Sequence, residues 1–192
     1  AFRLAWEQGA DGIETDCHLT KDGFVVCIHD KDTLRVSGRR LVVRDSTLEE
    51  LRRLDAGAHY AGDFQETAIP TIAEAFSTTP EGKVVYVEIK CGAEIIPTLL
   101  GEIERSGLKN EQIVIISFFA DVIEAFKKSA PQFRMFWLSS MKENESGAVE
   151  PTLNAVLETM KRIGADGFSS SKDNIDEPFI QSILQHGHDY HV

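Results

Sequence analysis

The sequence predicts an α/β fold in which most of the strands are parallel. Strand-like and helical patterns alternate along the whole chain of 192 residues, as they do where helices connect parallel strands. Seven strand candidates are visible, and a helical pattern precedes the first of them. This order fits a (β/α)8 barrel that is truncated at both ends, without its first strand and the end of its last one. A doubly wound sheet fits the same order.

The elements follow from the periodicity of the apolar residues. The chain opens in a helical rhythm at Phe2, Ala5 and Trp6. Strands are expected at residues 12–20, 24–29, 84–90, 113–118, 134–139 and 164–169, with another beginning at Tyr190. Helices are expected at residues 46–54, 71–77, 93–106, 120–129, 152–163 and 178–186. Two of the helix starts, at 46–49 and 71–74, have the pattern of capping boxes, in which side chains satisfy unpaired backbone donors.

The chain has the size of one domain. Hydrophobic residues make up 42% of it, which suffices for one core, whereas the length is too small for two large domains. Residues 1–192 are therefore expected to form a single, incomplete domain with an inserted segment at about 31–70. That segment is long for a barrel loop, so it is either a solvated loop or a cover over a site.

The composition limits the partners and the compartment. The net charge of −11 repels nucleic acid and anionic lipid, so a phosphate-containing substrate requires local positive charge. No apolar run approaches the roughly 18 residues of a membrane-spanning helix, and no stable membrane insertion is expected. Three cysteines without CxxC spacing are expected to be free thiols. A cytoplasmic location is favoured, but a secreted or periplasmic one stays open because any signal peptide would lie upstream of Ala1.

A tight hairpin joins the first two predicted strands. Lys21 and Asp22 leave no room for a crossover helix, so the strands are expected to pair antiparallel. If these two residues form the loop, Glu14 faces His29 across the pair, and Asp16 lies on the same face of the hairpin.

This register divides the hairpin into two faces. The polar face carries Glu14, Asp16, His18, Val25, Cys27 and His29. Asp16 then faces Cys27, and Cys17 points to the other side, so the two cysteines are not expected to bridge. An ordinary surface hairpin is the alternative. In an α/β domain, however, helices cover the outer side of the strands, which favours an interior site.

The next strand along the chain adds a third acidic residue. Glu88 and Lys90 share one face of it, which in a barrel points inward beside Glu14 and Asp16; a solvent-facing ion pair is the alternative. Three carboxylates at one place repel one another unless a cation joins them, and oxygen ligands select Mg²⁺, Mn²⁺ or Ca²⁺. Lys90 and His29 then supply a charge for a phosphate and a group that titrates near neutral pH.

These motifs resemble those of the glycerophosphodiester phosphodiesterase family. The resemblance rests on G-x-E-x-D, then T-K-D-G, a strand closing in H-D, and V-E-I-K, followed by the segments STLEEL, IPTIAEAF, IVIISFF and WLSS. It implies a TIM barrel with its site at the C-terminal mouth of the strands. It also implies a metal, Mg²⁺ or Ca²⁺, bound by Glu14, Asp16 and Glu88.

The resemblance assigns further roles within the site. His29 is one of two catalytic histidines, and Lys90 helps to hold the phosphate. Ser117 and Trp137 are further candidates for substrate binding. The alternative for Ser117 is a turn that ends its strand, and the alternative for Trp137 is packing in the core or at the rim.

Members of this family cleave glycerophosphodiesters, such as glycerophosphocholine, to glycerol 3-phosphate and an alcohol. The leading hypothesis is therefore a metal-dependent hydrolase of small phosphodiesters in lipid and glycerol metabolism. A phospholipase acting on intact lipid, resembling sphingomyelinase D or phosphatidylinositol-specific phospholipase C, is one alternative. A non-catalytic metal-binding or interaction barrel is the other. The oligomeric state stays open.

Two departures from the family pattern qualify this expectation. The H-R-G motif that carries the other catalytic histidine and the P-E-N-T after it are not in the sequence, and neither is the W-T-V-N of the last strand. Both gaps fall at the ends of the chain, which indicates a fragment. The chain as given is therefore expected to be nearly inactive.

Overall fold

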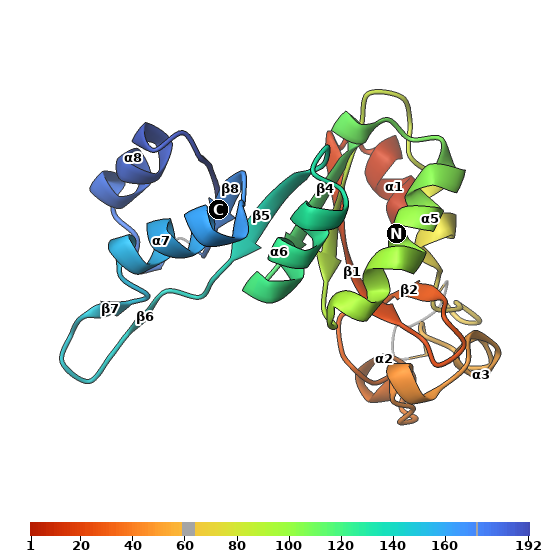
Figure 1. Cartoon of the computed structure of the whole chain (residues 1–192). Coiled ribbons are helices and arrows are strands. Elements are labelled where there is room, and N and C mark those ends of the chain that lie inside the picture. The colour runs from red at the N-terminus through yellow and green to blue at the C-terminus, as the bar shows by residue number, and fades with distance from the viewer. Residues whose placement is uncertain (59–63, 172) are drawn as a thin grey trace. The chain divides into compact units, whose positions relative to one another are not determined.

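The computed structural model describes residues 1–58, 64–171 and 173–192 (Figure 1). It forms two compact units, Ala1–Ile113 and Val114–Val192. Both units contain parallel strands joined by helices, as the alternating pattern of the sequence predicts. No helix within these described ranges has the length and hydropathy needed to cross a membrane.

Three strands organise the first unit. β1 (Gly12–Leu19) pairs parallel with β3 (Val84–Ile89) and antiparallel with β2 (Val25–Cys27). The helices are α1 (Phe2–Glu7), α2 (Leu34–Ser37), α3 (Leu48–Arg52), α4 (Ile72–Phe76) and α5 (Ile96–Ser106). Short 3-10 turns are η1 (Val43–Asp45), η2 (Ala93–Ile95) and η3 (Asn110–Gln112). The parallel register places Asp16 of β1 directly beside Glu88 of β3.

The loop of the β1–β2 hairpin has three residues, one more than predicted. The N–H of Thr20 donates to the carbonyl oxygen of Phe24 at 2.8 Å, which encloses Lys21, Asp22 and Gly23. Gly23 has a φ of +85°, the left-handed conformation that the last position of such a loop requires and that glycine adopts without steric cost. The extra loop residue moves the strand pairing by one position.

The shifted register changes which side chains face each other. Cys17 lies opposite Cys27, so the prediction that they lie on different faces is wrong. The predicted pairing of Asp16 with Cys27 is wrong for the same reason, because a slip of one residue turns every side chain of a strand to the other face. The predicted ladder partnership of Glu14 and His29 is also wrong: β2 ends at Cys27, two residues before His29.

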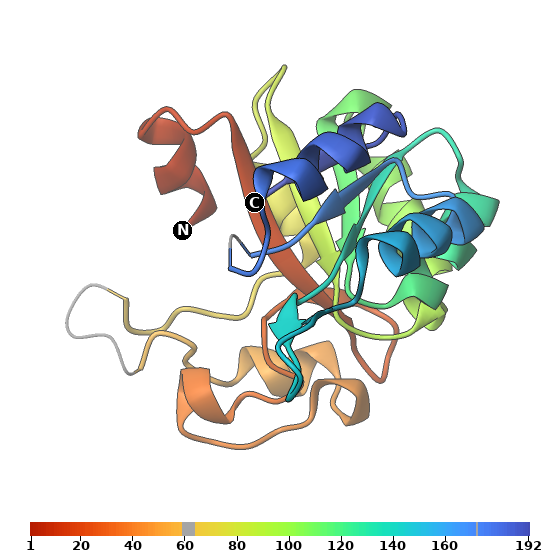
Figure 2. The ribbon, with the colours of Figure 1, turned by 90° about the vertical axis from the view of Figure 1, so that its left-hand side faces the viewer.

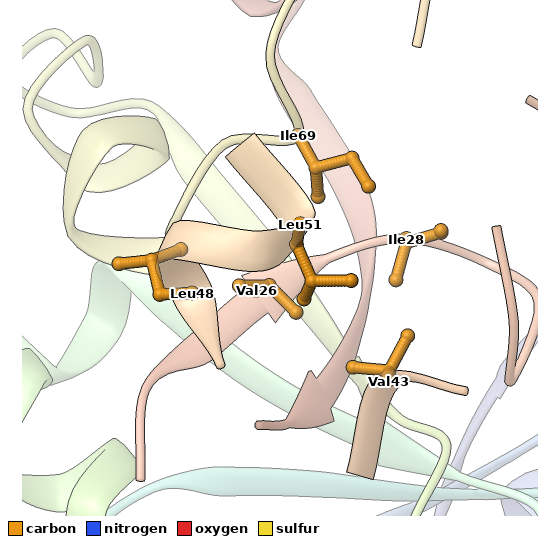
Figure 3. Close-up of a cluster of buried hydrophobic side chains, with 6 residues drawn as sticks. All are labelled: Val26, Ile28, Val43, Leu48, Leu51 and Ile69. Atoms are coloured by element: carbon orange, nitrogen blue, oxygen red, sulfur yellow. The ribbon is translucent and has the colours of Figure 1, made fainter. Parts of the chain in front are cut away.

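The segment at 31–70 packs against the strand that leads to His29. Its described parts contain α2, η1 and α3 and lie at the hairpin end of β1 (Figures 1 and 2). Figure 3 shows the buried cluster that joins this segment to β2 and the residue after it, which consists of Val26, Ile28, Val43, Leu48, Leu51 and Ile69. Packing of this segment therefore holds the backbone of β2 and the residues that follow it.

Capping boxes begin two helices of the first unit. At α3 the Thr47 side chain accepts from the backbone of Glu50, whose carboxylate accepts from the backbone of Thr47. The predicted box at 46–49 is thus wrong by one residue. At α4 the box formed by Thr71 and Glu74 is confirmed.

Four parallel strands run through the second unit, the first of them beginning at Ile113, where the first unit ends. β4 (Ile113–Ser117), β5 (Arg134–Leu138), β8 (Gly167–Ser169) and β9 (Asp189–His191) pair in this order. The helices are α6 (Ala120–Ser129), α7 (Leu153–Ile163) and α8 (Glu177–Gln185). A short hairpin of β6 (Lys142–Glu143) and β7 (Val149–Glu150) follows β5 and was not predicted (Figure 1).

Candidate active site

Three carboxylates converge in the first unit. Glu14 and Asp16 lie two residues apart on β1 and share a face, and Asp16 is the register partner of Glu88 on β3. Carboxylate oxygens of the three residues all lie within 4.8 Å of one another. Glu88 is buried, Asp16 is half-buried, and Glu14 is exposed. The structure therefore brings together all three of the predicted metal ligands.

Lys90 provides the cationic group beside these carboxylates. Its ammonium nitrogen donates to Oε1 of Glu88 at 2.9 Å and lies 3.4 Å from Oδ1 of Asp16. Burial alone would lower the pKa of Lys90. The hydrogen bond to Glu88 and the charges of Glu88 and Asp16 outweigh it, so the pKa of Lys90 is raised. Lys90 therefore stays charged at neutral pH.

One lysine does not balance three carboxylates, and the excess charge affects Glu14. Partial loss of solvation, then repulsion from Asp16 and Glu88, raises the pKa of Glu14 to about 7, although its side chain remains accessible to solvent. A carboxyl group with this pKa gives up its proton easily when a cation binds beside it. The all-oxygen donor set and its excess negative charge fit a hard divalent cation.

His29 is held by its neighbour in the sequence. Its Nδ1 lies 2.8 Å from Oδ1 of Asp30, and Arg35 donates to both carboxylate oxygens of Asp30 at 2.8 and 3.1 Å. The hydrogen bonds from Arg35 and His29 lower the pKa of Asp30 to about 2. An ionised carboxylate only accepts hydrogen bonds, so Nδ1 of His29 carries the proton. The other ring nitrogen, Nε2, lies 3.5 Å from the ammonium nitrogen of Lys90.

Asp30 and Arg35 were not among the predicted site residues. Asp30 had a signal in the sequence, because it directly follows His29 in the H-D pair. Arg35 had no such signal in the sequence, because its contact with Asp30 depends on the helical turn of α2. Together they fix the orientation of the imidazole ring, which is otherwise exposed to solvent.

His18 has a structural role in this arrangement. It is buried, and burial lowers its pKa, so the ring is neutral at pH 7. Nε2 lies 3.3 Å from the backbone carbonyl oxygen of His29 and donates to it. This bond anchors the backbone of His29 to β1 after β2 has ended.

A cavity of about 670 Å³ opens beside the carboxylates and His29. Glu14, Asp16 and His29 lie along one side of it. The remaining wall comes from the start of the chain, the residues before α4 and α4 itself, including Phe2, Arg3, Thr67, Pro70 and Glu74. Its size is within the range of small-molecule sites.

Ser117 and Trp137 lie in the second unit, where they are register partners on β4 and β5. Ser117 is fully buried, and its hydroxyl oxygen accepts from the N–H of Phe119 at 3.1 Å. The indole N–H of Trp137 donates to the carbonyl oxygen of Phe118 at 3.2 Å, and its ring lies 5.5 Å from that of Phe168. These contacts stabilise the strand ends, and a role in substrate binding stays a prediction for both residues.

The sequence matches the model of the glycerophosphoryl diester phosphodiesterase family over residues 1–192. The chain belongs to this family. It is 37% identical to the glycerophosphodiester phosphodiesterase of Caldanaerobacter subterraneus over 156 residues. This match covers 79% of this chain and 62% of that relative. The chain thus spans less than two thirds of the length of this curated relative.

Solved structures of the glycerophosphodiester phosphodiesterase family share the fold. One of them is an Oleispira antarctica phosphodiesterase in complex with the product sn-glycerol-3-phosphate, which has a TM-score of 0.86 at 22% identity. The match covers 98% of this chain and 74% of the Oleispira antarctica chain. The glycerophosphodiester phosphodiesterase of Thermotoga maritima has a TM-score of 0.75 at 24% identity, and the match covers 99% of this chain and 75% of that chain. The predicted TIM-barrel class is confirmed.

Proposed function

We propose that the protein hydrolyses small glycerophosphodiesters, such as glycerophosphocholine, to glycerol 3-phosphate and an alcohol, with the help of a divalent cation. The observation that supports this most is the grouping of three carboxylates, Lys90 and His29 in the first unit. The Oleispira antarctica relative in the fold comparison is in complex with the product sn-glycerol-3-phosphate, which agrees with this substrate class.

The roles of the residues follow from their chemistry. Glu14, Asp16 and Glu88 would hold Mg²⁺ or Ca²⁺, which neutralises negative charge on the phosphodiester when bound. Lys90 lies next to this group as a point charge for a phosphate oxygen. A role in substrate binding is also proposed for Ser117 and Trp137 of the second unit.

His29 is proposed to transfer the proton. Because Nδ1 is protonated toward Asp30, Nε2 is the nitrogen that accepts a proton from the attacking oxygen. The ionised Asp30 then stabilises the positive imidazolium that results, and the hydrogen bonds of Arg35 keep Asp30 in place. A single histidine serves as either base or acid in one step, so the leaving alkoxide receives its proton from another group.

Release of glycerol 3-phosphate from glycerophosphocholine, measured with and without EDTA, tests this function. We expect EDTA to abolish the release, Mg²⁺ or Ca²⁺ to restore it, and His29→Ala to reduce it by about 10²–10⁴-fold. His186→Ala is the matched control, because His186 is an exposed histidine at the end of α8. Release that is insensitive to EDTA, or unchanged in His29→Ala, would contradict the proposal.

The same assay separates the alternatives. Turnover of sphingomyelin or phosphatidylinositol vesicles without turnover of glycerophosphocholine would indicate a phospholipase. Cation binding without any turnover, even at a high protein concentration, would indicate a binding module. The 192-residue chain is expected to have low activity, so all of these measurements use a high protein concentration.

A further inference from the structure

Two of the three cysteines form a direct cross-strand pair. Cys17 of β1 and Cys27 of β2 are register partners, so their side chains lie on the same face of the hairpin. The N–H of Cys27 points away from β1 and donates to the carbonyl oxygen of Pro70. The N–H of the next residue, Ile28, points toward β1 and donates to the carbonyl oxygen of Asp16. The pair therefore occupies a non-hydrogen-bonded position of the antiparallel ladder, where opposite Cα atoms are about 4.5 Å apart.

This spacing lies within the range of disulfide bonds. Bridged cysteines have Cα atoms about 4.4–6.8 Å apart and Cβ atoms about 3.5–4.5 Å apart. A hydrogen bond between the two thiols raises the pKa of Cys17 and lowers the pKa of Cys27. The structure has no disulfide bond between them.

The two thiols differ in access. Cys27 is half-buried and lies on the wall of the cavity that also contains Asp16 and His29. Cys17 has no exposed surface, so a small reagent in the cavity meets Cys27 first. Cys91 is placed differently: the β3 partner of Cys17 is Ile89, two residues before Cys91, which puts Cys91 about 6–7 Å further along the sheet.

We propose that Cys17 and Cys27 form an oxidative modification site, at which a hydroperoxide converts the two thiols into a cross-strand disulfide beside the carboxylate group. The sulfur of Cys27 attacks the outer oxygen of the peroxide, whose O–O bond breaks. This yields a sulfenic acid and releases water or an alcohol. The sulfur of Cys17 then attacks the sulfenic sulfur, the S–O bond breaks, and the hydroxyl group leaves as water with the proton of the Cys17 thiol. The two thiols lose two electrons in total, and the peroxide gains them.

Trypsin separates the three cysteines, which makes the product easy to map. Cleavage after Arg3, Lys21, Lys31, Lys90 and Arg105 places Cys17 in peptide 4–21, Cys27 in peptide 22–31 and Cys91 in peptide 91–105. After treatment of the folded protein with an equimolar amount of hydrogen peroxide and blocking of the remaining thiols, we expect peptides 4–21 and 22–31 to be cross-linked. Before blocking, the intact mass should fall by two hydrogen atoms, and after blocking, peptide 91–105 should carry the blocking group.

Valine variants provide the controls, because a buried cysteine packs as a small apolar side chain. Cys17→Val should leave Cys27 as a sulfenic acid that is trapped by dimedone, with loss of the internal cross-link. Cys91→Val should form the cross-link as the wild type does. The proposal would be overturned by a cross-link that contains peptide 91–105, by dimers as the main product, or by oxidation of Cys27 in the wild type without a bond to Cys17. Mapping of the wild type decides these outcomes even if a variant folds poorly.

Discussion

The ammonium nitrogen of Lys90 lies 2.9 Å from a carboxylate oxygen of Glu88, two residues earlier along the chain. It also lies 3.4 Å from Oδ1 of Asp16. Lys90 therefore neutralises part of the negative charge that a bound cation would otherwise neutralise. Lys90 is thus expected to compete weakly with the cation for these carboxylates and to attract a phosphate once the cation is bound.

Lys90→Gln tests both effects. Binding of glycerol 3-phosphate in the presence of Ca²⁺ should weaken by about 10–100-fold, because a hydrogen bond to a charged group is worth about 1.5–3 kcal/mol. Affinity for Ca²⁺ alone should rise. Lys83→Gln is the matched control, since Lys83 precedes the same strand and pairs with Asp11 at 2.8 Å. Calorimetry measures the affinity of each variant for glycerol 3-phosphate and for Ca²⁺ against that of the wild type. Equal losses of affinity for glycerol 3-phosphate in the two variants would refute the assignment of Lys90.

The stability of the metal-free protein should depend on Glu14. Its pKa is about 7 in the folded state against an ordinary value of 4.5. Between these values the folded state binds more protons than the unfolded state, so this contribution to stability is present below about pH 4.5 and is lost as the pH rises through 7. Glu14→Gln should therefore be more stable than the wild type at pH 8, and the two should be nearly equal at pH 4.

Urea unfolding in EDTA at several pH values measures this difference. Glu7→Gln, which replaces an exposed glutamate on α1, should follow the wild type at every pH. A constant difference between Glu14→Gln and the wild type from pH 4 to pH 8 would contradict the raised pKa.

Asp30 is expected to act through His29 as a positioning residue. Asp30→Asn removes the ionised acceptor of Nδ1 and should lower kcat on glycerophosphocholine by about 10–100-fold with little change in KM. The ¹⁵N shifts of the His29 ring should show a change of tautomer in the same variant. Asp32→Asn, which removes the partner of Arg40 in the same segment, should change neither quantity. A larger effect on KM than on kcat would indicate a role for Asp30 in substrate binding.

The segment after β2 should depend on its buried cluster. Leu51 has no exposed surface, whereas Leu34 is 51% exposed. Leu51→Ala should reduce the free energy of unfolding by about 2–5 kcal/mol because it opens a cavity, and Leu34→Ala should change it by about 0.5 kcal/mol or less. Chemical denaturation checks both values. Similar effects of the two substitutions would show that the cluster does not stabilise this segment.

Much of the fold could be predicted because apolar periodicity determines element type. The strand at Val84–Ile89 and the helix at Ala120–Ser129 lie where their patterns indicate. The hairpin register could not be predicted in the same way, because both a two-residue and a three-residue loop fit T-K-D-G. The φ of Gly23 distinguishes them, and the sequence permits either conformation at a glycine.

The grouping of Glu14, Asp16 and Glu88 could be predicted because strand alternation and parallel pairing place them on one face. The position of His29 beside this group could not be predicted from the alternation of side chains along a strand. It lies beyond the end of β2, and the bond from His18 to its carbonyl oxygen and the contact with Asp30 hold it there. Contacts of this kind depend on tertiary structure and leave no periodic signal in the sequence.

Binding of Mg²⁺ and Ca²⁺ to wild type and Glu88→Gln, measured by isothermal titration calorimetry, tests the central claim most directly. Glu88 supplies the buried carboxylate of the group, and its replacement by a neutral amide should weaken cation binding at least about tenfold while the circular dichroism spectrum stays unchanged. Glu111→Gln, at an exposed glutamate of η3, should bind as the wild type does. An affinity of Glu88→Gln equal to that of the wild type would contradict the proposed metal site and, with it, the proposed mechanism.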